Sequence, residues 1–319
     1  MTAWLRVPAQ AARALAQTEP TYALALTRIG VGLTVLSTLI AMIWSESVAP
    51  IWFNPPDGGL RTLEPHHWLA RLAGAPAPAA VYGLMAAACV GAVGLTAGLG
   101  ARVCALVTLQ TLLALFALHP RTGGAHDRLI ANALWLLVLA PSDHSLSLRA
   151  RLWGRGWLDP TPAPLWTRWL VILQLTLMYA STGMQKVGAE WFVWGELSAV
   201  QRALLSPSWA RWDLTPLAAR ITPLLQAATA LSWLWEVTFV CVPLWLWARA
   251  TRTRPGRWRA ISNRIDLRSW MAAGGIVMHL ILLLLLELGP FSLISLALYP
   301  CLFSGAEWRR WLGRPADDA

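Results

Sequence analysis

Eight apolar segments follow one another along the chain and restrict what it can fold into. About 20 apolar residues in a helix cross the hydrocarbon of a bilayer, and a helix satisfies its own backbone hydrogen bonds there. Since the fourth and eighth segments are short for a span, we expect an all-α, polytopic integral membrane helical bundle of about eight transmembrane helices, within a range of seven to nine. The expected spans are residues 21–43, 79–98, 101–119, 126–141, 166–185, 223–248, 269–288 and 290–304.

The composition points the same way. Hydrophobic residues make up 56% of the chain and charged residues 13%, whereas a soluble domain carries about 25% charge. The 21 tryptophans suit the membrane–water boundary. A net charge of +10 is also found in nucleic-acid-binding proteins, but here the arginines lie between apolar segments and do not form a patch. We therefore expect the lipid bilayer, and not nucleic acid, as a partner.

The arginine distribution predicts an orientation. With a cytoplasmic N-terminus and eight spans, 17 arginines fall on the inside and seven on the outside. The positive-inside rule then places both termini in the cytoplasm and the long loops 44–78 and 187–222 outside. Arginine in place of lysine and a high alanine content are typical of a GC-rich bacterial genome. The expected location is the bacterial inner membrane.

The organisation of the chain is simple. We expect a single domain over residues 1–319 with its core at about 20–310, no cleavable signal peptide and no separate soluble domain. The turn at 98–102 predicts a hairpin between the second and third segments, and Gly91 and Gly94 permit close helix packing there. Four cysteines in apolar segments, without metal or disulfide spacing, indicate packing roles. They are Cys89, Cys104, Cys241 and Cys301.

Lys186 is the single lysine among 26 basic residues, and it ends a strongly apolar segment. An arginine stays protonated at any biological pH, whereas a lysine in an apolar site can lose its proton and act as a base or nucleophile. Lys186 is therefore the first candidate catalytic residue. The alternative is that it reaches to the interface as an anchor.

Two histidines accompany this lysine at membrane depth. Ionisable residues within spans are costly and often functional. His126 and Asp127 begin the fourth span at its outer end, His279 lies near the middle of the seventh, and Lys186 lies at the outer end of the fifth. We expect an active site that opens to the outer side of the membrane and includes Lys186, His126 and His279. The structural alternatives are a helix-capping role for His126–Asp127 and a hydrogen-bonded core histidine at 279.

The remaining buried charges are expected to be structural. Arg28 in the first span and Glu236 in the sixth are candidates for a buried ion pair. The other histidines have no metal-ligand spacing among them, so no metal site is expected.

Two motifs resemble a known family. They are His126-Asp-Arg-Leu-Ile-Ala-Asn-Ala-Leu, continuing to Asp143-His and Ser147, and Tyr179-Ala-Ser-Thr-Gly-Met-Gln-Lys186-x4-Trp191-x3-Gly195. Both resemble the vitamin K-dependent gamma-glutamyl carboxylase superfamily, and most of all its bacterial branch, the horizontally transferred transmembrane (HTTM) domain proteins. The resemblance covers about residues 20–310.

The resemblance implies a chemistry. Lys186 would deprotonate reduced vitamin K or a menaquinol, with His126 and His279 in the same active site. Oxygen would convert the quinol to its epoxide, and the strong base formed would let CO2 add to a carboxylatable acceptor. Asp127, Tyr179 and Trp191 are the candidate substrate-binding residues. No metal cofactor is implied.

The acceptor stays open. The eukaryotic carboxylases continue into a large extramembrane region that binds a peptide, and this chain ends at Ala319. The acceptor is therefore left open between two alternatives. One is a peptide or protein acceptor for coupled carboxylation, and the second is quinol oxygenation with another acceptor. A third is a non-enzymatic membrane carrier or assembly partner that keeps the fold.

Overall fold

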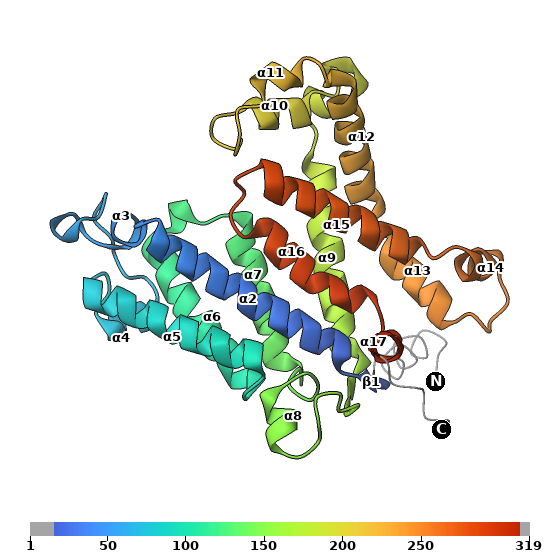
Figure 1. The fold of residues 1–319 in the computed structure, drawn as a ribbon, viewed down its shortest axis with the longest axis horizontal. Helices are drawn as coiled ribbons and strands as arrows, with labels where there is room; N and C mark the ends of the chain where they lie inside the picture. The colour runs from blue at the N-terminus through green and yellow to red at the C-terminus, as the bar shows by residue number, and fades with distance from the viewer. Residues whose placement is uncertain (1–15, 313–319) are drawn as a thin grey trace, which may run out of the picture. The chain divides into compact units, whose positions relative to one another are not determined.

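The computed structural model of the chain describes residues 16–312, and most of them are helical (Figure 1). The chain divides into two compact units. Unit 1 holds the described residues up to Val171 and those from Ala297 onward, and unit 2 holds Ile172–Leu296. Two helices, α9 (Leu165–Gln185) and α16 (Phe291–Leu298), cross from one unit to the other. A single domain over the whole chain stays a prediction.

Unit 1 is a bundle of helices with one short antiparallel strand pair, in which Glu19 lies opposite Ala163. Its longer helices α2, α5, α6 and α7 pack against one another. Its elements are β1 (Thr18–Pro20), α2 (Tyr22–Trp44), α3 (Val48–Trp52), η1 (Pro55–Asp57), α4 (Trp68–Ala73), α5 (Pro78–Ala97), α6 (Ala101–Leu118), η2 (Pro120–Thr122), α7 (Ala125–Leu139), α8 (Leu148–Leu152), β2 (Pro162–Pro164), η5 (Tyr299–Leu302) and α17 (Gly305–Trp311).

Unit 2 contains most of α9 and most of α16, with a set of short helices between long ones. Its further elements are η3 (Ala189–Trp191), η4 (Val193–Gly195), α10 (Ala199–Leu205), α11 (Thr215–Ala218), α12 (Thr222–Thr238), α13 (Cys241–Ala250), α14 (Arg257–Arg264) and α15 (Leu267–Leu285).

The expected all-α membrane architecture is confirmed, but the number of spans is not. Each of the eight expected segments contains a helix. Within residues 16–312, four helices are long and apolar enough to cross a membrane, namely α2, α5, α6 and α15. A fifth span is obtained when α12 and α13 are taken together.

The sixth expected segment is bent by 50° between α12 and α13. Pro243 explains the break, because it has no N–H to donate to the carbonyl of Phe239, and its ring crowds that carbonyl. The eighth expected segment is divided in a similar way, since α16 gives way to the 3-10 helix η5 one residue before Pro300.

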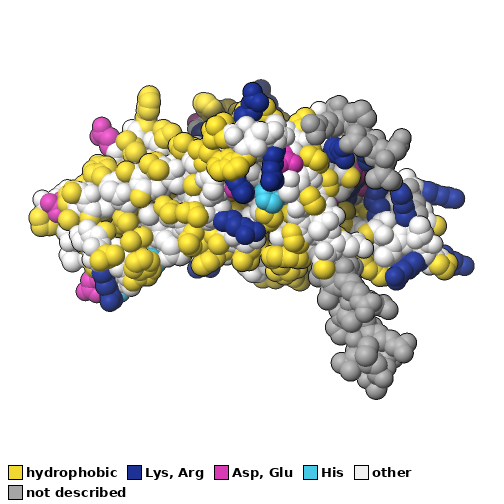
Figure 2. Space-filling model, turned by 90° about the horizontal axis from the view of Figure 1, so that it is seen from below, with side chains coloured by type: hydrophobic (Ala, Val, Ile, Leu, Met, Phe, Trp, Pro, Cys, Tyr) yellow, Lys and Arg dark blue, Asp and Glu magenta, His cyan; other side chains and the backbone are white. Residues whose placement is uncertain are grey.

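Apolar side chains cover much of the molecular surface seen in Figure 2. On the candidate spans they are exposed along whole helices, where water would disfavour them and lipid would not. Examples are Leu33 and Ile40 on α2, Val90 and Val93 on α5, Val103 on α6, and Val277 and Leu284 on α15. This surface, together with the apolar helices, identifies an integral membrane protein.

The predicted hairpin between α5 and α6 is confirmed. Helix α5 starts at Pro78 and ends at Ala97, and the next residue, Gly98, has a φ of +74°, the left-handed conformation that favours glycine. The glycines on α5 bring the helices together, as predicted. A Cβ on Gly91 would lie 2.4 Å from Thr108 Oγ1, and one on Gly94 would lie 2.6 Å from Cys104 Sγ.

Arg28 is completely buried in unit 1 and joins three segments. Its guanidinium donates hydrogen bonds to the carbonyl of Leu95 at 3.1 Å and to that of Leu146 at 2.7 Å. It therefore connects α2 to the end of α5 and to the loop after α7. The expectation that Arg28 pairs with Glu236 is wrong, because Arg28 donates to two carbonyl oxygens and Lys186 is the cation paired with Glu236.

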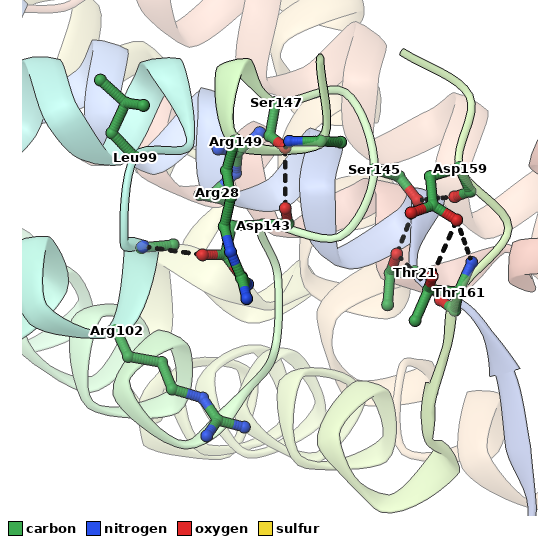
Figure 3. A network of polar contacts seen from close by, with 12 residues as sticks. Thr21, Arg28, Leu99, Arg102, Asp143, Ser145, Ser147, Arg149, Asp159 and Thr161 are labelled. Atoms are coloured by element: carbon green, nitrogen blue, oxygen red, sulfur yellow. Dashed lines mark hydrogen bonds and ion pairs between the residues drawn. The ribbon is translucent and has the colours of Figure 1, made fainter. Parts of the chain in front are cut away.

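The loop after α7 is held by a network of polar contacts (Figure 3). Asp143 accepts hydrogen bonds from the Ala101 N–H at 3.2 Å and from Arg149 Nη1 at 3.0 Å. Farther along, Ser145 Oγ donates to the Asp159 carbonyl at 2.5 Å and lies 2.6 Å from Thr21 Oγ1. The motif from Asp143 to Ser147 thus ties the loop to the starts of α2 and α6.

Candidate functional site

The single lysine of the chain is paired with a glutamate in unit 2. Lys186 Nζ lies 2.6 Å from Glu236 Oε2. Lys186 directly follows α9, and Glu236 lies near the C-terminal end of α12. Their side chains are 19% and 12% exposed, so the pair is largely shielded from solvent. The two charges are close enough for a proton to pass directly between nitrogen and oxygen.

Gly183 allows α9 to approach α12 at this place. A Cβ on Gly183 would lie 3.0 Å from the Val237 backbone nitrogen and 3.1 Å from Glu236 Cβ. Both distances are shorter than ordinary contacts, and backbone atoms cannot swing aside as a flexible side chain can. The glycine in the Tyr179–Lys186 motif therefore sets the helix spacing that brings Lys186 to Glu236.

An aromatic ring covers the lysine. Lys186 Nζ lies 4.1 Å from the centroid of the Trp191 ring, a cation–π distance. A tight turn holds this part of the chain, because a Cβ on Gly195 would lie 2.1 Å from the Ala189 carbonyl oxygen. The spacing from Lys186 to Trp191 and Gly195 thus places an indole face against the amine. Phe192 and Trp194 add a stacked aromatic pair beside it in sequence, with centroids 4.6 Å apart.

A second buried polar pair lies on the same helix. Tyr179 on α9 and His279 on α15 are buried, and the Tyr179 hydroxyl lies 2.6 Å from His279 Nε2. Ser292 Oγ lies 3.4 Å from the other ring nitrogen. Trp235 of α12 and Phe239, the residue after this helix, pack against the Tyr179 ring with centroids 4.6 and 4.7 Å away. His279 is thus a hydrogen-bonded core residue that belongs to a line of polar groups.

Tyr179 and Thr182 share one face of α9, and Lys186 directly follows this helix. Residues three, four and seven apart in a helix lie on the same side. Tyr179 and Thr182 follow this spacing toward Lys186, and the Thr182 hydroxyl is a further neighbour of the Glu236 carboxylate. The axial distance from residue 179 to 186 is about 10 Å at 1.5 Å per residue. Unit 2 therefore holds two polar pairs, Tyr179–His279 and Lys186–Glu236, whose first members are seven residues apart in the chain.

His126 belongs to unit 1 and has its contacts there. It lies in the first turn of α7, with Nε2 3.5 Å from Asp127 Oδ1. The other oxygen of Asp127 accepts a hydrogen bond from the Gly124 N–H at 2.7 Å. The His126 ring packs on Gly124, where a Cβ would lie 2.5 Å from it. Asp127 thus caps the helix, and the joint use of His126 and Lys186 in one active site stays a prediction.

The sequence-based prediction missed the partner of the lysine. Glu236 was recognised as a costly charge within an apolar segment, but its predicted partner was Arg28 and not Lys186. They are separated from Glu236 by about 210 and 50 residues in the chain. No local pattern selects between them, and only the packing of α9 on α12 does so.

Comparison with known proteins gives one family. The HTTM domain model matches residues 17–257, about three quarters of the chain. The matched region includes His126, Lys186, Trp191 and Glu236, whereas His279 lies beyond it. No curated protein and no solved structure matches the chain. The chain is a member of the HTTM domain family, a branch of the vitamin K-dependent carboxylase-like superfamily, which contains enzymes.

Proposed function

We propose that this protein is a membrane enzyme that oxygenates a reduced naphthoquinone, such as a menaquinol, with Lys186 as the base. The observation that carries the proposal is the 2.6 Å contact between Lys186 Nζ and Glu236 Oε2 beneath the Trp191 ring. A base needs a group that takes its proton, and a carboxylate in contact with an ammonium is such a group.

The chain's own residues would act as follows. Glu236 accepts a proton from the Lys186 ammonium and becomes a carboxylic acid, which leaves a neutral amine. The neutral Lys186 amine then accepts the phenolic proton of the quinol. The amine becomes an ammonium, and the quinol becomes a quinolate. Trp191 supplies a flat apolar surface that suits an aromatic ring. Shielding from solvent strengthens the interaction between these charges.

A bound quinol supplies the oxygen chemistry: reduced quinone and O2 give the quinone epoxide and water. In the carboxylases that this family resembles, the same step supplies the base for the addition of CO2. The identity of the acceptor is a separate question, because Lys186 and Glu236 can deprotonate the quinol without a carboxylation step. A peptide or protein acceptor remains the carboxylating alternative, and no metal is assigned a role.

His126 and His279 enter the proposal differently. His279 would orient Tyr179 through their 2.6 Å hydrogen bond. Tyr179 lies on α9, seven residues before Lys186. His126 is proposed from the family resemblance as a second polar group of the active site. The proposed location is the bacterial inner membrane with both termini in the cytoplasm and the active site open to the outer side, as the arginine distribution predicts.

The test is an aerobic assay of the detergent-solubilised protein with reduced naphthoquinone, in which the epoxide is measured by mass spectrometry. The sharpest variant is Lys186→Arg, because arginine keeps the charge opposite Glu236 but does not give up its proton. Loss of a positioned base lowers turnover by about 10²–10⁴-fold. We expect that loss in Lys186→Arg and Lys186→Ala, with both proteins folded.

Two outcomes would count against the proposal. Wild-type epoxide formation by Lys186→Arg would exclude the lysine as the base. Absence of epoxide from the folded wild type, with added CO2 and peptide glutamate as well, would favour the non-enzymatic carrier or assembly partner. An uptake assay in proteoliposomes, with the wild type and Glu236→Gln, would then test the carrier directly.

A further inference from the structure

A cavity of about 350 Å³ lies in unit 1, away from Lys186 in the chain. Its walls come from two segments: the loop at residues 61–66, before α4, and the end of α6 with the turn η2. A water occupies about 30 Å³ in the liquid, and small-molecule sites begin at about 300 Å³. The cavity is therefore large enough for a polar group with an organic substituent.

The charges that line this cavity favour a monoanion. Arg61 and Arg121 each contribute a guanidinium, and Glu64 contributes a carboxylate. The arginines and the glutamate together give one net positive charge. Within residues 16–312, the side chains of Arg61 and Arg121 make no hydrogen bond or ion pair. A guanidinium group binds a phosphate through two parallel N–H···O hydrogen bonds. Two arginines with free donors therefore suit the oxygens of a phosphate.

The depth of the cavity indicates where the phosphate comes from. Leu118, in the cavity wall, is the last residue of α6, a helix long and apolar enough to span the membrane. The end of a span lies at the level of the lipid head groups. Around the cavity loop, Leu60 and Trp68 are 83% and 60% exposed, and an exposed tryptophan is typical of this interface. The cavity thus opens where phospholipid phosphates are concentrated.

We propose that this cavity binds the phosphodiester of an anionic phospholipid with a polyol head group, such as phosphatidylglycerol. Arg61 and Arg121 hold the phosphate, whose single negative charge balances the net charge of the cavity. Glu64 accepts hydrogen bonds from the head-group hydroxyls, and the acyl chains leave the cavity along the apolar surface of α6. This lipid site is independent of the proposed quinol chemistry.

The test measures lipid binding to the full-length protein after removal of co-purified lipid. Short-chain phosphatidylglycerol, phosphatidylcholine of equal chain length and inorganic phosphate are titrated separately by calorimetry. The variant is Arg61→Gln/Arg121→Gln. The control is Arg128→Gln/Arg220→Gln, which removes two exposed arginines that do not line the cavity. A second variant, Arg61→Lys/Arg121→Lys, keeps the charge and guards against a folding defect.

We expect wild type and control to bind phosphatidylglycerol equally and the cavity variant to bind it at least about tenfold more weakly, with partial rescue by the lysine variant. Equal binding by the cavity variant and the control would overturn the site. Equal wild-type affinity for phosphatidylcholine would overturn the anionic head group. Inorganic phosphate bound as tightly as the lipid would overturn the lipid source and leave a site for soluble phosphates.

Discussion

Arg28 in unit 1 and Lys186 in unit 2 are shielded cations with different kinds of partner. In unit 1, Arg28 donates to two backbone carbonyls, and Asp143 accepts from a backbone N–H and from Arg149. In unit 2, the Lys186 and Glu236 side chains form an ion pair. The first arrangement fixes the chain, because the partners are backbone groups at the ends of helices. The second leaves a pair of side chains between which a proton can move.

The residue types follow this division. An arginine keeps its proton at any biological pH and offers five donors, so it suits a position where carbonyls need permanent partners. A lysine and a carboxylate can exchange a proton. The comparison therefore separates charges that hold the fold from charges suited to chemistry, and substitutions in each unit can test it.

The largest loss of stability is expected from Arg28→Met. The change removes the donor of the Leu146 carbonyl and one of the two donors of the Leu95 carbonyl, and a buried acceptor that loses its partner costs about 1–3 kcal/mol. Unfolding of the detergent-solubilised protein by denaturant measures it. Arg102→Met is the matched control, because Arg102 is exposed and makes one long contact of 3.5 Å. Equal stabilities of the two variants would contradict a structural role for Arg28.

A smaller loss is expected from Gly183→Ala. The added methyl group meets the backbone of α12 at Val237, and overpacking of this kind costs about 1–3 kcal/mol. Epoxide formation should fall as well, since the change moves Lys186 relative to Glu236. Gly83→Ala on α5 is the control, because nothing lies within 4 Å of its Cβ position. It should be neutral or slightly stabilising, and a similar loss in both variants would exclude the close approach as the cause.

The Lys186–Glu236 pair should show coupling in a double-mutant cycle. Lys186→Met and Glu236→Gln each leave a partner alone in a shielded place, whereas the double variant removes both. We expect the double variant to be more stable than the sum of the two losses predicts, by about 1 kcal/mol. Additive losses would mean that the two side chains do not interact in solution, and the proton-transfer step would lose its support.

The smallest effect is a pH dependence in the unit 1 loop. Burial lowers the pKa of His144 below its usual 6.5, and the charge of Asp143 only partly opposes this. Below pH 6.5 the unfolded chain therefore binds a proton that the folded chain does not, so stability falls as the pH falls. His144→Gln should reduce this fall between pH 6.5 and 5 in denaturant titrations. An unchanged slope would assign the dependence to other groups, of which His67, with a pKa also lowered by burial, is the first candidate.

The positions of the helices could be predicted because their cause is local. Apolar segments of the right length give α2, α5 and α6 to within about two residues, and Gly98 ends α5 as its backbone freedom predicts. The bend at Pro243 is the exception that a hydropathy pattern alone does not reveal. Proline forbids one hydrogen bond, and whether the chain then bends or ends depends on what packs around it.

The candidate site was predictable in part for the same reason. Lys186 stands out as a titratable cation next to an apolar segment, and Trp191 follows it closely enough that local turns bring the ring to the amine. The contacts of Tyr179 with His279 and of Lys186 with Glu236 join residues 100 and 50 positions apart. Their geometry depends on how α9 packs on α12 and α15.

The sequence by itself therefore determined the membrane class, the helices, the hairpin at Gly98 and the unusual lysine, because hydrophobicity, backbone freedom and side-chain chemistry are properties of single residues and short segments. Only the tertiary structure decided the partners: carbonyl oxygens for Arg28, the carboxylate of Glu236 for Lys186, and two arginines around one cavity. A buried charge must be neutralised or hydrogen-bonded. The sequence shows which charged residues lie in apolar segments, but the packing of distant helices selects their partners.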